Sequence, residues 1–199
     1  MIFIASLTLI GKETVYSLRG FCGLGLSFAA DGFGVILAVL TGAIWLITTI
    51  FSKEYMAAER NRNRYYFFVF LTLGATMGIF LSADLFTTFI FFEIMSFTSF
   101  VLVMHDEEDF TVRSAKTYLA VAVIGGLVTL MGLFMMYQKA GTLNMAELTA
   151  FMQSRENPAE FYAIGVLILF GFAAKAGLFP LHIWLPNAYT VAPAPSSAL

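Results

Sequence analysis

Four ionisable side chains lie within or beside long apolar stretches of this sequence: Glu93, Lys116, Lys175 and His182. Glu93 is about eight residues into its apolar stretch, or roughly 12 Å deep at the rise of an α-helix. Lys175 is about fourteen residues into another stretch, roughly 21 Å from its start. Charges at membrane depth are costly, and those that occur there usually mark ion or substrate pathways. The residue types therefore predict proton transfer, with Lys175 as the proton carrier and Glu93 as its switchable counter-ion.

Each of these residues also has a purely structural interpretation. Glu93 could be a neutral, hydrogen-bonded carboxyl group, and Lys175 could extend its amine to the far membrane surface. The segment Gly177–Pro180 argues against the second alternative, because a broken helix frees backbone groups that need water or protein partners. Lys116, predicted in the first turn of its helix, fits either a side chain that reaches the membrane surface or a relay. His182 follows Lys175 by seven residues and fits a proton shuttle or a hydrogen-bonded interfacial histidine.

The composition is that of an integral membrane protein. The 199 residues are 59% hydrophobic and 12% charged, about half the charged fraction of a soluble domain. The net charge of -2 argues against a nucleic-acid partner. A single cysteine, Cys22, excludes a disulfide within the chain and an all-cysteine iron–sulfur or metal site. Two histidines far apart, with no nucleotide-binding motif, predict neither a metal nor a cofactor nor a redox centre in this chain.

The hydropathy pattern predicts an all-α fold, a polytopic bundle of five full transmembrane spans with partial elements at both ends. A spanning helix needs about 20 mostly apolar residues. The spans are expected at Phe33–Phe51, Tyr65–Leu81, Leu85–Met104, Ser114–Tyr137 and Phe161–Pro180, the last of them broken near Gly177–Pro180. We expect residues 1–199 to form a single transmembrane domain. The remaining expectations are a half-span at Met1–Ile10, an interfacial loop at Gly11–Ala30, helix caps at Asp31 and Asp84, and a surface helix at Asn144–Arg155.

The basic residues predict an orientation. The connections Ser52–Arg64 and His105–Arg113 fall on one side and carry Lys53, Arg60, Arg62, Arg64 and Arg113, with Lys116 just beyond them. The connections Gly11–Ala30 and Gln138–Glu160 fall on the other side and carry Lys12, Arg19, Lys139 and Arg155. The positive-inside rule places the first set in the cytoplasm.

Several segments resemble a known family. ADGFGVILAVLT (30–41), FFEIMSFTSFVLV (91–103), AKTYLAVAVIGG (115–126) and above all KAGLFPLHIWLPNAYTVAPAPSSAL (175–199) are similar to the antiporter-like membrane subunits of respiratory complex I. That family includes the membrane arms of energy-converting hydrogenases and the multisubunit Na⁺/H⁺ antiporters. The resemblance implies inverted repeats with broken helices. Glu93 matches the family's ion-pair glutamate, Lys175 its channel lysine, Lys116 the lysine of the following span, and His182 the histidine of the P-L-H-x-W-L-P element.

The sequence departs from the family pattern in three ways. Asn187 stands where an acidic residue is usual, and Pro195-Ser196-Ser197 stands where P-T-x-x-S is usual. The chain also ends at Leu199, so the resemblance implies part of the first half of a subunit, with the second repeat absent.

The resulting prediction is a proton-translocating membrane subunit of a redox-driven complex, such as a complex I-like oxidoreductase or a hydrogenase, in a prokaryotic inner membrane. Its expected partners are other membrane subunits, the lipid bilayer and H⁺ or Na⁺. Two alternatives stay open. One is a Na⁺/H⁺ antiporter subunit, and the other is a non-conducting scaffold that only docks partner subunits.

Overall fold

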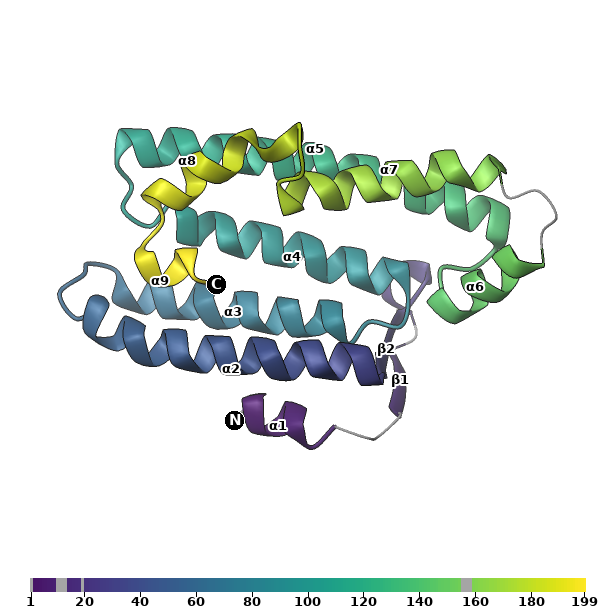
Figure 1. The fold of residues 1–199 in the computed structure, drawn as a ribbon, viewed down its shortest axis with the longest axis horizontal. Coiled ribbons are helices and arrows are strands. Elements are labelled where there is room, and N and C mark those ends of the chain that lie inside the picture. The colour runs from purple at the N-terminus through teal and green to yellow at the C-terminus, as the bar shows by residue number, and fades with distance from the viewer. Residues whose placement is uncertain (1, 10–13, 19, 155–158) are drawn as a thin grey trace.

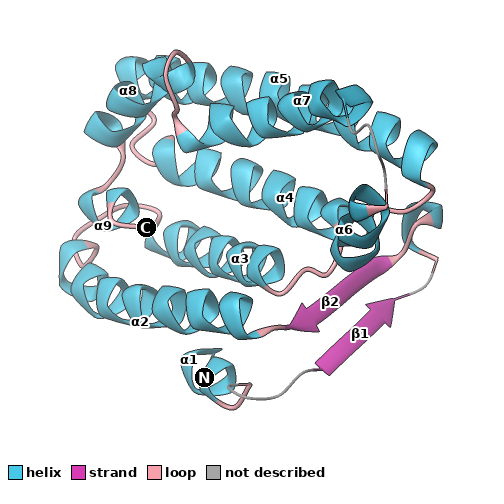
Figure 2. Ribbon diagram, turned by 45° about the vertical axis from the view of Figure 1, so that its right-hand side comes forward, coloured by secondary structure: helices cyan, strands magenta, loops and turns pink. Residues whose placement is uncertain are grey.

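A computed structural model describes residues 2–9, 14–18, 20–154 and 159–199 of the chain. Within these residues the fold is a bundle of long helices with a short hairpin at one end (Figures 1 and 2). The helices are α1 (Ile2–Leu7), α2 (Gly32–Tyr55), α3 (Arg62–Phe80), α4 (Leu85–Val103), α5 (Asp109–Ala140), α6 (Met145–Gln153), α7 (Ala159–Ala176), α8 (Trp184–Val191) and α9 (Ala194–Ser197). The strands are β1 (Thr14–Leu18) and β2 (Leu26–Ala30), and short 3₁₀ turns occur at Phe21–Gly23 and Leu181–Ile183.

The long helices confirm the predicted membrane bundle. Four segments among the described residues are long and apolar enough to cross a membrane: α2, α4, α5 and the stretch Phe161–Val191. The fifth predicted span is α3, which is 19 residues long and lies between α2 and α4 (Figure 1). Polar residues, two arginines among them, lower its hydropathy, although it buries Tyr65 and Val69 against its neighbours. The chain is therefore an integral membrane protein.

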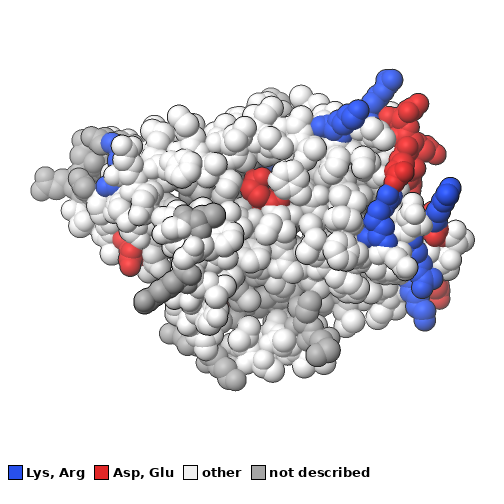
Figure 3. Space-filling model, turned by 180° about the vertical axis from the view of Figure 1, so that it is seen from behind, with Lys and Arg blue, Asp and Glu red and all other residues white. Residues whose placement is uncertain are grey.

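On the face drawn in Figure 3, charged side chains gather at the two ends of the bundle, and the belt between them is largely uncharged. The larger group lies at the end that carries the α2–α3 and α4–α5 connections. The belt is interrupted by acidic atoms near its middle (Figure 3). This distribution is what a bilayer requires, because lipid-facing charge at mid-depth is expensive. Lys12, Arg19 and Arg155, which enter the predicted orientation, lie outside the described residues.

The region predicted as an interfacial loop contains a β-hairpin instead. Strands β1 and β2 pair antiparallel, with Thr14 opposite Ala30 and Leu18 opposite Leu26. The buried carboxylate of Asp84 anchors β2 to α4, since it accepts hydrogen bonds from Ser27 N at 3.1 Å and from Thr87 Oγ1 at 2.6 Å. The loop prediction missed the hairpin because its strand residues show no apolar–polar alternation, and all five of β1 are exposed.

Most of the predicted local signals are confirmed. Asp31 caps α2 by accepting a hydrogen bond from Gly34 N at 2.7 Å, and Asp84 caps α4 by accepting one from Thr87 N at 2.7 Å. Asn144 caps the surface helix α6. One boundary was wrong: α5 begins at Asp109 instead of Ser114. Lys116 therefore lies about two turns into α5 and not in its first turn.

The helix break after Lys175 is confirmed and has a local cause. Gly177 adopts a left-handed conformation with φ of 68°, which suits a residue without a β-carbon. Leu178 N donates to Ala173 O at 3.0 Å, a bond that closes the end of α7 in the usual glycine-terminated manner. Trp184 Nε1 donates to Ala174 O at 2.8 Å, so a carbonyl near the break is bonded by a side chain from α8.

Glycines let α5 and α7 pack closely, which sets the position of Lys175. A β-carbon on Gly125 would lie 3.0 Å from the Ala174 side chain, and one on Gly171 would overlap Thr129. Small residues at such contacts are typical of helix pairs in membranes, where backbones must approach closely to gain packing energy. The contact brings the end of α7 against the middle of α5.

Candidate ion-translocation site

The amine of Lys175 is held inside the bundle and does not extend to a membrane surface. Its Nζ donates a hydrogen bond to Ser99 Oγ of α4 at 3.1 Å. The same atom lies 4.3 Å from the ring centroid of Tyr118 on α5, within the range of a cation–π contact. The structure thus favours a buried amine with specific partners over the alternative of a lysine that reaches the lipid headgroups.

Ser99 and Tyr118 form a small polar network around that amine. Their hydroxyl oxygens are 2.6 Å apart, and Ser99 Oγ also donates to Met95 O at 2.6 Å. The Tyr118 ring packs against the Trp184 ring with centroids 4.8 Å apart. Because Trp184 also bonds the backbone of α7, the network links α4, α5, α7 and α8 around Lys175. A cage assembled from four helices can hold an amine inside the bundle.

Glu93 lies against the backbone of α5, at the glycine next to the one that contacts α7. A β-carbon on Gly126 would lie 3.0 Å from its Oε2 and closer still to its Oε1. Only glycine at this position leaves room for the carboxyl group. Oε1 is buried and has no hydrogen-bond partner among the described residues. An unsatisfied carboxyl oxygen in a membrane interior is unfavourable, so this group is poised to accept a proton or a cationic partner.

The structure brings Glu93 and Lys175 into one electrostatic neighbourhood without joining them. Glu93 lies against Gly126 of α5, and Ala174, the residue before Lys175, lies against Gly125. No ion pair within 4.0 Å connects these two described residues, in contrast to the ion pair between Arg64 and Glu107 at the end of the bundle. Lys175 therefore occupies the Ser99–Tyr118 cage, while Glu93 Oε1 has no hydrogen-bond partner in the described part of the chain.

Lys116 and His182 lie elsewhere. Both side chains are exposed, Lys116 on α5 and His182 in the 3₁₀ turn before α8. The His182 ring packs loosely on Phe179, with centroids 5.6 Å apart. Among the described residues, no hydrogen bond or ion pair joins either residue to Glu93 or Lys175.

Sequence reasoning missed the groups that hold Lys175. Ser96 and Ser99 follow Glu93 at intervals of three, and this spacing of hydroxyls within a predicted span was an available signal. Tyr118 gave no comparable signal, because an aromatic residue near the start of a span is equally typical of a membrane interface.

The site lies within a region that matches a known family. Residues 82–199 match the family described as NADH:quinone oxidoreductase/Mrp antiporter, TM, and this range contains Glu93 and Lys175. A Na⁺/H⁺ antiporter subunit of Alkalihalophilus pseudofirmus is 33% identical over 175 residues, covering 88% of this chain and 36% of that protein. The protein of the same name in Bacillus subtilis matches with the same identity and coverage. The chain thus spans about a third of the length of the curated relatives it matches.

Two solved structures share the fold. A chain of the Mrp complex from Dietzia sp. DQ12-45-1b superimposes with a TM-score of 0.83 at 25% identity, covering 98% of this chain and 38% of that one. A chain of the membrane-bound sulfane sulfur reductase, an archaeal respiratory membrane complex, gives 0.87 at 24% identity and covers 98% and 41%. The second likeness shows the fold alone. The predicted resemblance is confirmed, and the chain belongs to the NADH:quinone oxidoreductase/Mrp antiporter family of membrane subunits.

Proposed function

We propose that this chain is part of the first half of an ion-translocating membrane subunit, in which Lys175 carries a proton and Glu93 is its switchable counter-ion. One observation carries the proposal: the Lys175 amine is bonded to Ser99 at 3.1 Å while the nearby Glu93 Oε1 is buried without a partner. In a purely structural ion pair the amine and the carboxylate would be in contact. The amine of a proton carrier must instead be able to leave one partner and reach another.

The arrangement supports two positions for the amine. In one, Nζ rests on Ser99 Oγ and the Tyr118 ring, as in this structure. In the other, it moves to the Glu93 carboxylate, which attracts the protonated form more strongly than the hydroxyl cage does. Cation–π and neutral hydrogen-bond partners hold the amine without a counter-charge, so the proton is released more readily from the cage. Exchange between these positions would load and unload one proton.

Lys116 and His182 are proposed as relay groups further along the path. Both side chains are exposed, so a proton that arrives at either of them would pass through water or through neighbouring chains. A histidine is suited to such a step because one ring nitrogen can take up a proton while the other releases one.

Replacing Tyr118 by phenylalanine tests the cage. The change keeps the ring beside Lys175 but removes the hydroxyl 2.6 Å from Ser99 Oγ. A neutral hydrogen bond contributes about 0.5–1.5 kcal/mol, so we expect proton translocation to fall about two- to tenfold. The measurement is the rate of proton uptake by vesicles that contain the assembled complex, normalised to the amount of complex. Tyr137→Phe, the same change at an exposed tyrosine near the other end of α5, is the matched control and should leave the rate close to that of the wild type.

We favour cation/proton antiport in a multisubunit complex as the setting, in the inner membrane of a bacterial cell. The support is the 33% identity to two proteins that are named as subunits of Na⁺/H⁺ antiporters. A redox-driven proton pump is the second candidate, since the matched family also includes NADH:quinone oxidoreductase subunits. In either setting other membrane subunits are the proposed partners.

Reconstitution of the complete complex separates these settings. Vesicles with an imposed pH gradient are given Na⁺, and the internal pH is followed with a dye. Antiport predicts that Na⁺ dissipates the gradient at once, whereas a redox-driven pump predicts proton movement only after an electron donor is supplied. If the chain is only a scaffold, the proton flux of the complex should be the same in Lys175→Met and Glu93→Gln as in the wild type. That result would contradict the proposal.

A further inference from the structure

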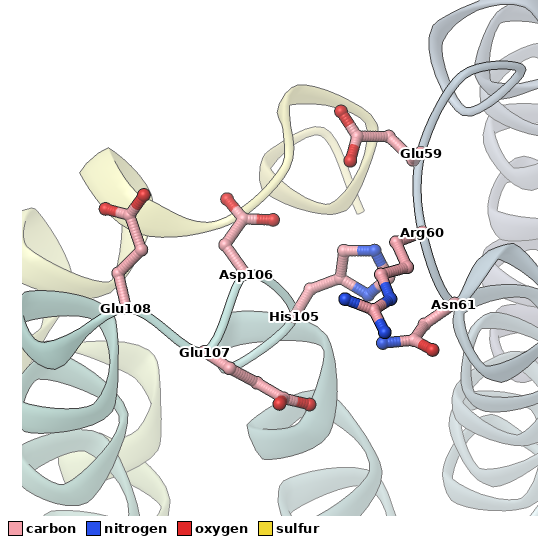
Figure 4. A pocket seen from close by; sticks show the side chains of 7 residues that line it. All are labelled: Glu59, Arg60, Asn61, His105, Asp106, Glu107 and Glu108. Atoms are coloured by element: carbon pink, nitrogen blue, oxygen red, sulfur yellow. The ribbon is translucent and has the colours of Figure 1, made fainter.

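A cavity of about 550 Å³ opens at the end of the bundle away from the hairpin. The turn between α2 and α3 (residues 59–61) and the turn between α4 and α5 (residues 105–108) line it (Figure 4). This volume is within the range of cavities that take a small ligand or a long side chain. The cavity lies outside the uncharged belt, at the end where charged residues gather (Figure 3). A ligand would therefore reach the cavity from water or as part of another protein, and not through the lipid tails.

The two turns are held in fixed shapes. Arg64 forms an ion pair with Glu107, and its Nη2 donates to His105 O at 2.9 Å. Glycines aside, the described part of the chain has a positive φ only at Asn61, with 66°, and at Glu107, with 56°. Both residues line this cavity. Such conformations cost free energy in residues with side chains and persist where the surroundings enforce them.

His105 is the buried polar group of the cavity. It is only 5% exposed, and its Nε2 has no hydrogen-bond partner among the described residues. Burial lowers its pKa, and Arg64 acts in the same direction, while Asp106, Glu59 and Glu107 oppose the effect. The Tyr65 ring packs on it edge-on at 5.5 Å between centroids. The net lowering keeps the imidazole neutral at neutral pH, so Nε2 can accept a hydrogen bond when the ring proton is on Nδ1.

Unpaired acidic groups line the same cavity as this histidine. In Figure 4 the carboxylates of Glu59, Asp106 and Glu108 stand on the same side of the turns, whereas Glu107 points the other way. Glu107 is paired with Arg64, which holds the pKa of its carboxyl below the usual range. Glu59, Asp106 and Glu108 form no ion pair with any described residue. Among the described residues that line the cavity, Arg60 is the one with a positive charge. The cavity thus has an excess of negative charge, and the buried imidazole in its wall has an Nε2 without a hydrogen-bond partner among the described residues.

We propose that this cavity receives an arginine or lysine side chain from a neighbouring subunit. Such a group would complement the unpaired carboxylates and supply an N–H donor for His105 Nε2. A dissolved metal ion fits less well, because the described residues contain no group of three or more His, Cys, Asp or Glu side chains arranged to hold one. The proposal concerns assembly and does not depend on which ion the complex carries.

A photo-crosslinking amino acid in place of Glu108, in the complete complex, tests this contact. After illumination the crosslinked peptide is identified by mass spectrometry. We expect it to belong to another subunit and to contain a lysine or arginine close to the link. The same amino acid in place of Glu54, which is exposed at the same end of the bundle but outside the cavity, should crosslink to that peptide far less strongly.

Charge reversal supplies the second measurement. Asp106 and Glu59 are exposed, so Asp106→Lys and Glu59→Lys should leave the fold intact. Like charges across an interface are strongly unfavourable, and we expect each change to lower the crosslink to the neighbouring subunit by about tenfold or more. Replacing the identified basic residue by glutamate in the Asp106→Lys background should restore it.

Crosslinks only within the same polypeptide, or a yield that charge reversal leaves unchanged, would overturn the proposal. Transport assays on the same samples are a separate readout, so loss of docking and failure of the transport hypothesis give different results.

Discussion

Replacing Lys175 by methionine should lower proton translocation by the assembled complex about 100-fold or more, which is the scale of a lost proton-transfer group. Methionine fills similar apolar space but has no titratable nitrogen. Ser99 and Tyr118 would keep their 2.6 Å hydrogen bond, so the cage would persist without its carrier. The measurement is the initial rate of proton uptake by vesicles, divided by the amount of complex on a native gel.

Lys53→Met is the matched control for this experiment. Lys53 is exposed in the last turn of α2, so its loss should leave the rate close to that of the wild type. Lys175→Arg is informative as well, because a guanidinium stays protonated under all physiological conditions and cannot unload a proton. A Lys175→Met complex that assembles normally and pumps at the wild-type rate would rule out Lys175 as the carrier.

The second large effect is expected for Glu93→Gln, which keeps the shape of the side chain but removes its charge. In the proposed mechanism the Glu93 carboxylate draws the protonated amine away from Ser99, and a neutral glutamine amide would not do so. We expect translocation to fall about tenfold or more, because an attraction between charges of roughly 1.4 kcal/mol or greater is lost. The assay is the same vesicle measurement.

Two further variants separate charge from position. Glu54→Gln removes an exposed carboxylate at the end of α2 and should have little effect. Gly126→Ala keeps the Glu93 charge but places a methyl group where its carboxyl group lies, so we expect a loss that approaches that of Glu93→Gln. If Gly126→Ala and Glu93→Gln both translocate normally in assembled complexes, Glu93 is a structural carboxyl and not a switch.

Much of the bundle could be predicted from the sequence because a bilayer imposes simple rules. The spans that become α2, α4 and α5 are long apolar runs, and the caps at Asp31 and Asp84 follow local capping chemistry. The break after α7 was predictable because Gly177 and Pro180 interrupt an apolar run. The half-span predicted at Met1–Ile10 is the six-residue helix α1, with Met1 and Ile10 themselves outside the described residues.

The hairpin and the start of α5 could not be predicted in the same way. Strand β1 is exposed along its whole length, so no burial pattern marks it, and β2 is held by the distant residue Asp84. The acidic and basic residues from Asp109 to Arg113 resemble a loop, but Asp109 suits the first turn of a helix, where the helix dipole favours negative charge.

The candidate site could be predicted in its charges but not in its geometry. Glu93 and Lys175 stand out because they interrupt apolar spans. Their relative position depends on Gly125, Gly126 and Gly171, whose effect is visible only when α4, α5 and α7 are packed together. The orientation in the membrane, the relay roles of Lys116 and His182, and the assignment of residues 1–199 to one domain stay predictions.

A double-mutant cycle on proton translocation tests most directly whether Glu93 and Lys175 act as one unit. Rates are measured for the wild type, Glu93→Gln, Lys175→Met and the double variant in vesicles with equal amounts of assembled complex. If the carboxylate acts only through the amine, the double variant should be no slower than Lys175→Met alone, because residues that function together lose their effects together. Independent losses that multiply, so that the double variant is slower than Lys175→Met by the full factor lost in Glu93→Gln, would contradict a shared proton path.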